Sequence, residues 1–294
     1  MSAPNMRLAA LRRFAITITV VNLLGRTILG FENSWAQMLV ALLTAYGAEI
    51  FLEIVDAWAG RRTPKFAGGV TNLIDFLLPA HISGLAVSML LYAGGLLLPF
   101  AFAAAVAIAS KHLFTVAVNN VHRHFLNPSN TGIALTVLLF PALTPIMPWQ
   151  FTETLSSNLS SAFPVVIICL GTFMNVRYAK RMPLVLGWVV AFALQGVVRC
   201  LINDLPLVVG LIPMTGVGFV LFTFYMITDP GATPSDRREQ VIFGAATAFL
   251  YGMLVISHIG FAFFYALLIV SVTRGVILHV QNWRLAAKPS LSSS

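Results

Sequence analysis

Residues 183–202 read PLVLGWVVAFALQGVVRCLI, an apolar run of the kind that decides the fold of this chain. A helix needs roughly 17 to 25 apolar residues to cross a membrane. We expect ten such runs, at 14–31, 36–57, 72–92, 95–110, 130–148, 163–176, 183–202, 206–227, 240–257 and 260–280. Of the 294 residues, 58% are hydrophobic and 10% are charged, against about 25% charged residues in a soluble domain. The sequence therefore predicts an all-α polytopic membrane protein with about ten transmembrane helices.

The basic residues predict the orientation of these helices. The formal net charge is +8, and every Lys and Arg except Arg26, Arg199 and Arg274 falls on one side if the N-terminus is cytoplasmic. Cytoplasmic loops of membrane proteins are rich in Lys and Arg, so we expect a multi-pass protein of the cell membrane with both termini cytoplasmic. The basic N-terminus has no signal-peptide cleavage site, so the first run is expected to remain as a helix. No soluble basic domain is present, which excludes nucleic acid as a partner.

Ten helices divide into two five-helix repeats, at 1–150 and 151–294. A repeated unit with an odd number of crossings must be inverted relative to its copy. Run 72–92 contains Pro79 and then Gly84, and run 206–227 contains Pro213 and then Gly218 at the same spacing. Proline removes a helix hydrogen bond and glycine permits unwinding, so both runs are candidate broken helices. Residues 111–122 are too short and polar to cross, and are expected to form an interfacial or re-entrant turn.

Two polar segments interrupt the apolar sequence, HFLNPSNTG at 124–132 and FYMITDPG at 224–231. Polar backbone at membrane depth is costly unless it lines a protected cavity, so the pair points to a site. Their amides, hydroxyls and carboxylate suit a planar ligand rich in heteroatoms, such as an isoalloxazine ring. The alternative is that each segment ends or begins a helix, because Asn, Asp, Ser and Thr cap helices and Pro favours the first turn. The candidate cofactor-binding residues are His124, Asn127, Pro128, Ser129, Asn130, Thr228, Asp229 and Pro230.

Ionisable residues within the runs suggest an ion or substrate path. Glu49, Glu53 and Asp56 share one helical face, but Glu53 and Asp56 lie within reach of Arg61 and Arg62 and are expected to pair there. Glu49 is deeper and is the better candidate. A lone histidine in a span is more often a hydrogen-bonded packing residue than a proton carrier. The candidate path residues are Glu49, Asp75, His81, Ser83, Gly84 and Gly218. The two cysteines, Cys169 and Cys200, form no metal-binding motif, so no metal site is expected.

Three motifs carry a resemblance to a known family: Ile82-Ser83-Gly84, residues 222–230, and, within 122–132, the residues His122, Arg123, His124, Asn127, Pro128, Ser129, Asn130 and Gly132. With them the chain resembles the RnfD/NqrB family, whose large members are membrane components of the Rnf electron-transport complex and of the sodium-pumping NADH:quinone oxidoreductase. Within that family it is most similar to the shorter homologues encoded with enediyne antibiotic biosynthesis. The resemblance implies ten spans in two inverted repeats, bound flavin, and electron transfer across the membrane.

The flavin expected from the resemblance is FMN or riboflavin held without a covalent bond. Large-complex members attach one flavin to a threonine in a Ser/Thr-Gly-Ala-Thr motif, whereas residues 154–161 read TLSSNLSS at the corresponding place. The sequence Gly231-Ala232-Thr233 follows Pro230 inside the second polar segment, and we interpret its overlap with that motif as accidental.

These patterns leave three functional hypotheses open. The first is a membrane electron-transfer protein that relays electrons through a non-covalent flavin. The second is a small-molecule or cation transporter or channel on the same scaffold without redox chemistry. The third is a membrane anchor whose short cytoplasmic loops dock a soluble or membrane redox partner. The oligomeric state and the electron donor and acceptor are left open by the sequence.

Overall fold

The computed structural model describes residues 3–118, 121–145 and 157–286. The first half of the described chain contains α1 (Ala3–Leu24) with the π-helical turn η1 (Gly25–Leu29), α2 (Trp35–Ala59), α3 (Val70–Leu90), α4 (Leu98–Leu113), β1 (Thr115–Val118), β2 (Val121–His124) and α5 (Pro128–Leu139). The second half contains α6 (Ser157–Met174) with η2 (Asn175–Ala179), α7 (Met182–Ile202), α8 (Leu207–Leu211), η3 (Ile212–Thr215), α9 (Val217–Leu221), η4 (Phe222–Met226), α10 (Arg237–Ile256) and α11 (Ala262–Ala286).

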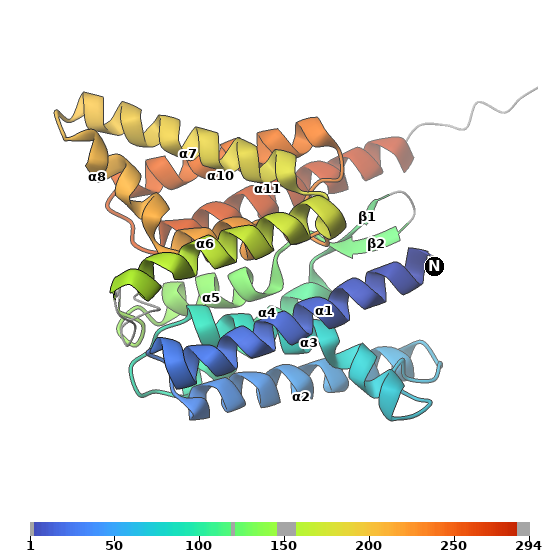
Figure 1. The fold of residues 1–294 in the computed structure, drawn as a ribbon. Coiled ribbons are helices and arrows are strands. Elements are labelled where there is room, and N and C mark those ends of the chain that lie inside the picture. Colours follow the sequence, from blue (N-terminus) through green and yellow to red (C-terminus); the bar gives the residue numbers. More distant parts are fainter. Residues whose placement is uncertain (1–2, 119–120, 146–156, 287–294) are drawn as a thin grey trace, which may run out of the picture.

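The helices lie side by side as one bundle, with α1–α5 below and α6–α11 above in Figure 1. The start of α1, the β1–β2 hairpin and the end of α11 lie at the same end of the bundle, which we call the hairpin end. The two strands pair antiparallel, with Thr115 opposite His124 and Val118 opposite Val121.

Lengths and surfaces of the helices confirm an all-α, multi-pass membrane protein. Among the described residues, α2, α3, α7, α10 and α11 are each long and apolar enough to cross a membrane, and the bent pair α8–η4 makes a sixth candidate. The outer face of α7 exposes Leu186, Val190, Leu194 and Val198, one helical turn apart, at 44% to 64%. An exposed apolar stripe of this kind is unfavourable in water and is expected where a helix faces lipid.

The broken helix expected in run 206–227 is confirmed. Its two parts, Leu207–Thr215 and Val217–Met226, meet at a bend of 64°. Gly216 takes an extended conformation (φ −76°, ψ 144°), so the helix stops at Thr215, two residues after Pro213, and starts again at Val217. The same expectation is wrong for run 72–92, because α3 continues through Pro79 to Leu90. Gly84 stays helical there, and a Cβ at Gly84 would lie 3.2 Å from the Ala41 carbonyl oxygen, so this glycine serves close packing with α2.

Several expected boundaries also differ from the structure. Helix α1 begins at Ala3 rather than at residue 14, and α4 extends to Leu113. The stretch 111–122 forms the end of α4 and most of a β-hairpin instead of a re-entrant turn. Helix α5 has only 12 residues and ends at Leu139, short of the expected residue 148, which lies outside the described residues.

One continuous hydrophobic core runs through both halves, but its composition differs between them. The first half packs on alanine, and Ala41, Ala45, Ala103, Ala104 and Ala107 are all 0% or 1% exposed. Small residues let helix backbones approach closely in a membrane. The second half packs on an aromatic cluster whose ring centroids lie 4.6 to 6.4 Å apart and which comprises Trp188, Phe192, Phe219, Phe222, Tyr251 and Phe263.

Candidate functional site

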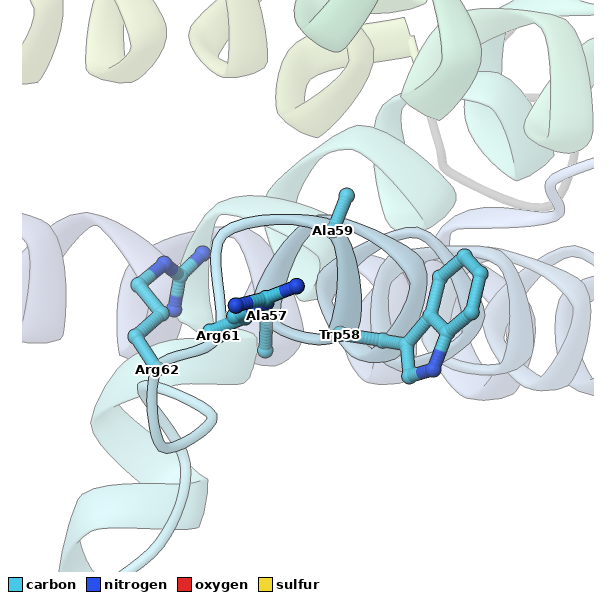
Figure 2. Close-up of a pocket in the computed structure, with 5 residues that line it drawn as sticks. All are labelled: Ala57, Trp58, Ala59, Arg61 and Arg62. Atoms are coloured by element: carbon cyan, nitrogen blue, oxygen red, sulfur yellow. The ribbon is translucent and has the colours of Figure 1, made fainter.

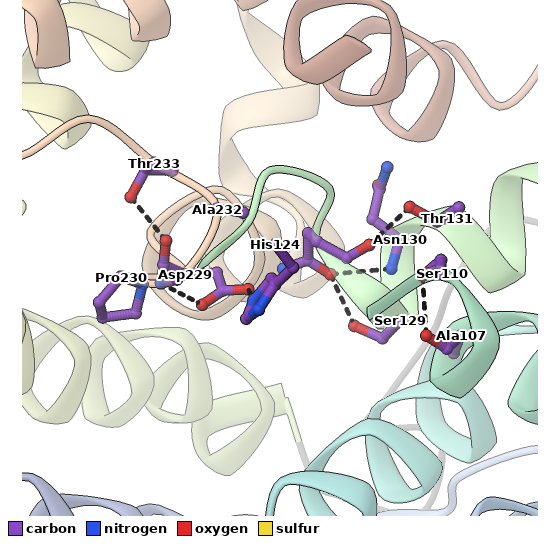
Figure 3. A network of polar contacts seen from close by, with 12 residues as sticks. Ala107, Ser110, His124, Ser129, Asn130, Thr131, Asp229, Pro230, Ala232 and Thr233 are labelled. Carbon is purple, nitrogen blue, oxygen red and sulfur yellow. Dashed lines mark hydrogen bonds and ion pairs between the residues drawn. The ribbon is translucent and has the colours of Figure 1, made fainter. Parts of the chain in front are cut away.

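The two polar segments, about a hundred residues apart in sequence, meet at the hairpin end (Figure 3). Asn127 caps α5: its Oδ1 accepts from the Asn130 backbone N–H at 2.9 Å and from Ser129 Oγ at 3.0 Å. Pro128 follows in the first helical turn, where a missing N–H costs nothing. Asn127 Nδ2 then donates to the Met226 carbonyl at 2.9 Å, which joins the first half to the second. Capping, the alternative interpretation of this segment, is therefore confirmed together with a contact between the halves.

Asn130 makes the second bond between the halves. Its side chain is 1% exposed, and Nδ2 donates to the Phe264 carbonyl on α11 at 3.0 Å. Its Oδ1 is buried without a hydrogen-bond partner among the described residues. Such an atom is uncommon in a folded protein, because an unpaired buried acceptor costs free energy.

Asp229 is the acidic residue in the contact between the two polar segments. Its Oδ1 accepts from the Gly231 backbone N–H at 2.9 Å, and its Oδ2 lies 3.4 Å from His124 Nε2. Burial by itself raises the pKa of Asp229, but the bond to His124, the Gly231 N–H and the charge of Arg181 outweigh it and hold the pKa below its usual value. Thr228 faces its own helix, donating from Oγ1 to the Phe224 carbonyl at 2.7 Å. We call the contacts of His124, Asn127 and Asn130 with Met226, Asp229 and Phe264 the clasp.

Two arginines, Arg181 and Arg274, hold the Asp229 loop. Arg181 is 6% exposed; its Nε donates to Thr233 Oγ1 at 2.9 Å and its Nη2 to the Pro230 carbonyl at 3.3 Å. Arg274 Nη1 donates to the Ala232 carbonyl at 3.1 Å. Burial lowers the pKa of Arg181 below the usual arginine value, with Asp229 opposing the change. The distribution of Lys and Arg predicted only that Arg181 lies in a cytoplasmic loop. No local sequence pattern distinguishes a buried loop arginine from an exposed one.

A flavin ring does not fit between the two polar segments of the clasp. Both amide atoms of Asn127 are already bonded within the protein. At Gly231 the position of a Cβ would overlap His124 Nε2, so the two segments are in direct contact. A surface hollow of about 590 Å³ lies elsewhere, at the end of α2, lined by Ala57, Trp58, Ala59, Arg61 and Arg62 (Figure 2). None of the sequence-predicted site residues lines that hollow.

A second polar arrangement lies between α1 and α3 in the first half. Arg12 makes a two-pronged contact with Asp75, with Nε to Oδ1 at 2.8 Å and Nη2 to Oδ2 at 2.6 Å. Thr19 Oγ1 lies 2.7 Å from His81 Nε2. Arg26 Nη2 lies 3.1 Å from the Ser88 carbonyl. We call these three pairs the α1–α3 seam.

The seam has a regular register. Its pairs are separated in sequence by 63, 62 and 62 residues, so the two helices run parallel and meet at about every second turn. Two further residues join it: Tyr46 of α2 lies 2.5 Å from His81 Nδ1, and Asn22 Oδ1 accepts from Arg26 at 2.7 Å. Arg26, one of the three basic residues that fall within the expected runs, turns inward to Asn22 and Ser88.

The remaining path candidates do not converge with the seam. Glu49, 3% exposed, pairs with Lys111 at 2.6 Å and lies 3.4 Å from His112, both at the end of α4. Glu53 and Asp56 both pair with Arg62, as the sequence indicated. Ser83 is 9% exposed on α3, and Gly218 is the second residue of α9 in the other half, where its carbonyl accepts from the Phe222 N–H. The structure thus brings Asp75 and His81 into one seam and leaves Glu49 and Gly218 outside it.

No protein-family model matches the chain, and no curated protein matches its sequence. The likeness to the membrane components of the Rnf complex and the sodium-pumping oxidoreductase therefore rests on the motif residues alone.

Proposed function

We propose that the chain crosses the membrane ten times, as two inverted five-helix repeats with the hairpin end in the cytoplasm. Corresponding helices have corresponding neighbours: α2 packs on α3 and α4, as α7 packs on α8 and α10. Helices α1 and α6 both end in a π-helical turn closed by a left-handed residue, Gly30 (φ 82°) and Lys180 (φ 55°). These parallels support a repeat in which the α8–η4 pair corresponds to α3.

We further propose that the protein moves a small cation across the bilayer along the α1–α3 seam. The observation that carries this proposal is the regular spacing of the three polar pairs. Arg12 and Arg26 are 14 residues apart, or about 21 Å along a helix that rises 1.5 Å per residue. That distance is about two-thirds of the 30 Å hydrocarbon layer of a bilayer.

Interhelical hydrogen bonds also hold membrane helices together, so the seam must be weighed against a purely structural role. Hydroxyl and amide groups would suffice for that role, and the second half achieves tight packing with aromatic rings. The seam instead contains Arg26 and His81 within its helices, with the exposed pair of Arg12 and Asp75 at its cytoplasmic end. Ionisable groups within membrane-spanning segments are costly and usually mark ion or proton pathways. A transport role accounts for that cost, whereas packing does not.

Purified protein in liposomes, driven by a valinomycin-induced potassium potential, provides the test. Flux of H⁺ is followed with an internal pH dye, and flux of Na⁺ and K⁺ with tracer ions. We expect flux of one of these ions, and a loss of at least tenfold in Thr19→Val, which removes the oxygen facing His81.

Thr247→Val is the matched control for this test. Thr19 and Thr247 both donate to the carbonyl four residues earlier, at 2.7 and 2.8 Å, but only Thr19 belongs to the seam. Equal flux in the two variants, or no flux of any of the three ions in the wild-type protein, would refute the transport proposal.

Electron transfer through a non-covalent flavin is the second candidate function. The observation that favours it is the clasp, because the two motifs that carry the resemblance meet as one unit. The clasp holds no gap for the ring between its segments, so a flavin would have to bind beside it. Asn130 Oδ1, buried and unpaired among the described residues, is the acceptor there that a ligand donor could still use.

Absorption spectra of the purified protein, before and after addition of riboflavin or FMN, test this candidate. Asn130→Ala should weaken flavin uptake, whereas Asn203→Ala, whose exposed amide donates to the Arg199 carbonyl, should not. A protein that is colourless and takes up neither flavin contradicts the redox function.

A further inference from the structure

His81 occupies the middle of the seam and the middle of its helix. It lies 11 residues after Val70, the first residue of α3, which corresponds to about 16 Å along the helix axis. Both ring nitrogens are engaged by hydroxyl groups, Nε2 by Thr19 at 2.7 Å and Nδ1 by Tyr46 at 2.5 Å. A histidine held in this way has one proton-donating and one proton-accepting nitrogen when it is neutral.

The hydrogen bonds of Thr19 determine which nitrogen carries the proton. A threonine hydroxyl has a single proton, and Thr19 donates it to the Ala15 carbonyl at 2.7 Å. Thr19 Oγ1 must therefore accept from His81, so Nε2 carries the proton of the neutral ring. The lone pair of Nδ1 then accepts from the Tyr46 hydroxyl. The basic nitrogen of the ring consequently faces α2.

We propose that the ion moved along the seam is H⁺, and that it binds at Nδ1 of His81; this inference rests on the transport function proposed above. The proton comes from water and forms an N–H bond at Nδ1. The Tyr46 hydroxyl rotates, so that its oxygen accepts from Nδ1–H, while Nε2–H still donates to Thr19. The imidazolium carries one positive charge, and release of the same proton restores the neutral ring.

The surroundings of His81 suit a proton better than a metal cation. A cation such as Na⁺ needs several oxygen ligands, whereas the oxygens of Thr19 and Tyr46 are occupied by bonds to His81 and Ala15. The buried side-chain oxygens that have neither a hydrogen bond nor an ion pair among the described residues belong to Asn33, Asn130, Asn175, Gln240 and Ser271, and none belongs to this group. A proton needs only one lone pair, and the lone pair of His81 Nδ1 is already oriented by its hydrogen bond with the Tyr46 hydroxyl.

Helices α1, α2, α4 and α5 pack against α3, and α5 contributes no ionisable residue. The paired ionisable groups on the other elements are Arg12 on α1, Arg26 in the η1 turn that follows α1, Tyr46 and Glu49 on α2, Asp75 on α3, and Lys111 and His112 on α4. Asp75 and Glu49 are already neutralised by Arg12 and by Lys111. A proton on His81 is therefore held mainly by its two hydroxyl partners, which favours reversible binding.

Proteoliposome flux at a series of pH values, with H⁺, Na⁺ and K⁺ measured separately, tests the inference. We expect H⁺ flux that falls at least tenfold in His81→Gln and in Tyr46→Phe. His258→Asn is the control: this histidine lies in the turn after α10 with φ 57°, a conformation that asparagine adopts readily. Nitrogen-15 NMR of histidine-labelled protein gives a readout independent of flux, and we expect His81 to show the Nε2–H form at high pH and to take up one proton at low pH.

The outcomes separate the two proposals. Proton flux that survives both His81→Gln and Tyr46→Phe overturns the inference, as does a His81 signal with the proton on Nδ1 at high pH. Flux of Na⁺ or K⁺ without H⁺ flux overturns the inference and leaves the transport function standing. Absence of all three fluxes overturns the function, and the inference with it. If His81→Gln does not fold, Tyr46→Phe and the NMR signal of the wild-type protein decide the question.

Discussion

Replacement of Asn127 separates the two contributions of the clasp to stability. Asn127→Ser keeps an oxygen that can accept from the Asn130 N–H, but it is too short to reach the Met226 carbonyl. Asn127→Ala loses both the cap and the bond between the halves. Loss of an N-cap costs about 1 kcal/mol. Loss of one buried hydrogen bond costs about 1 kcal/mol.

The expected loss in the free energy of unfolding is therefore about 1 kcal/mol for Asn127→Ser and about 2 kcal/mol for Asn127→Ala. Reversible unfolding in mixed micelles, titrated with sodium dodecyl sulfate and followed by circular dichroism, measures both values. Asn203→Ala is the control, because its amide is exposed and donates to the Arg199 carbonyl four residues earlier, at 2.8 Å. We expect a change within about 0.5 kcal/mol there.

The reasoning fails if both Asn127 variants unfold like the wild-type protein, since the clasp would then contribute nothing. It also fails if serine is as destabilising as alanine, because the oxygen that caps α5 would then have no effect. Either result would mean that the contact between the halves is held by apolar packing alone.

Three further outcomes are expected. Gly132→Ala should destabilise the fold by about 1 to 3 kcal/mol, because its Cβ would overlap the Ala103 carbonyl oxygen and push α4 from α5. Gly47→Ala is the control and should be tolerated, because a Cβ there has nothing within 4 Å. Equal unfolding midpoints for the Gly132 and Gly47 variants in the same titration would contradict this prediction. Asp229 has a lowered pKa in the folded chain, so its charge stabilises the fold above the ordinary aspartate pKa of about 3.9 and this stabilisation is lost as the pH falls through the folded value. Asp229→Asn should therefore flatten the acid limb of stability against pH, and an unchanged acid limb would show that the pair with His124 is not coupled to folding. Ser34→Ala should cost about 1 kcal/mol, because Ser34 and Gln37 form a capping box at the start of α2, and a midpoint equal to that of the wild type would argue against it.

Sequence patterns predicted the long uninterrupted helices well. Run 36–57 corresponds to α2 at Trp35–Ala59, and run 183–202 corresponds to α7 at Met182–Ile202. Helix α5 was placed less well, because the apolar sequence continues after Leu139 while the helix does not. Hydropathy measures how apolar a segment is and does not indicate the residue at which a helix ends within it.

The candidate sites show the same limit. The polar segments at 124–132 and 224–231 were predicted to form one site, and the structure joins them through Asn127 and Met226. The seam could not be predicted, because it depends on α1 and α3 lying parallel, although α2 separates them in sequence. Thr19 and Tyr46 gave no local signal, since both residue types are common in membrane helices and matter here only through His81.

The clasp has a consequence for how this protein can change in evolution. Its asparagines reach main-chain carbonyls, so Met226 and Phe264 can be replaced by other residues without loss of either bond. Selection then acts on one partner only at these two bonds, and paired substitutions do not accumulate there. Methods that infer proximity from correlated changes between positions will detect the joint between the two halves only through side-chain pairs such as His124 and Asp229, and crosslinking or mutagenesis is needed to detect the asparagine bonds.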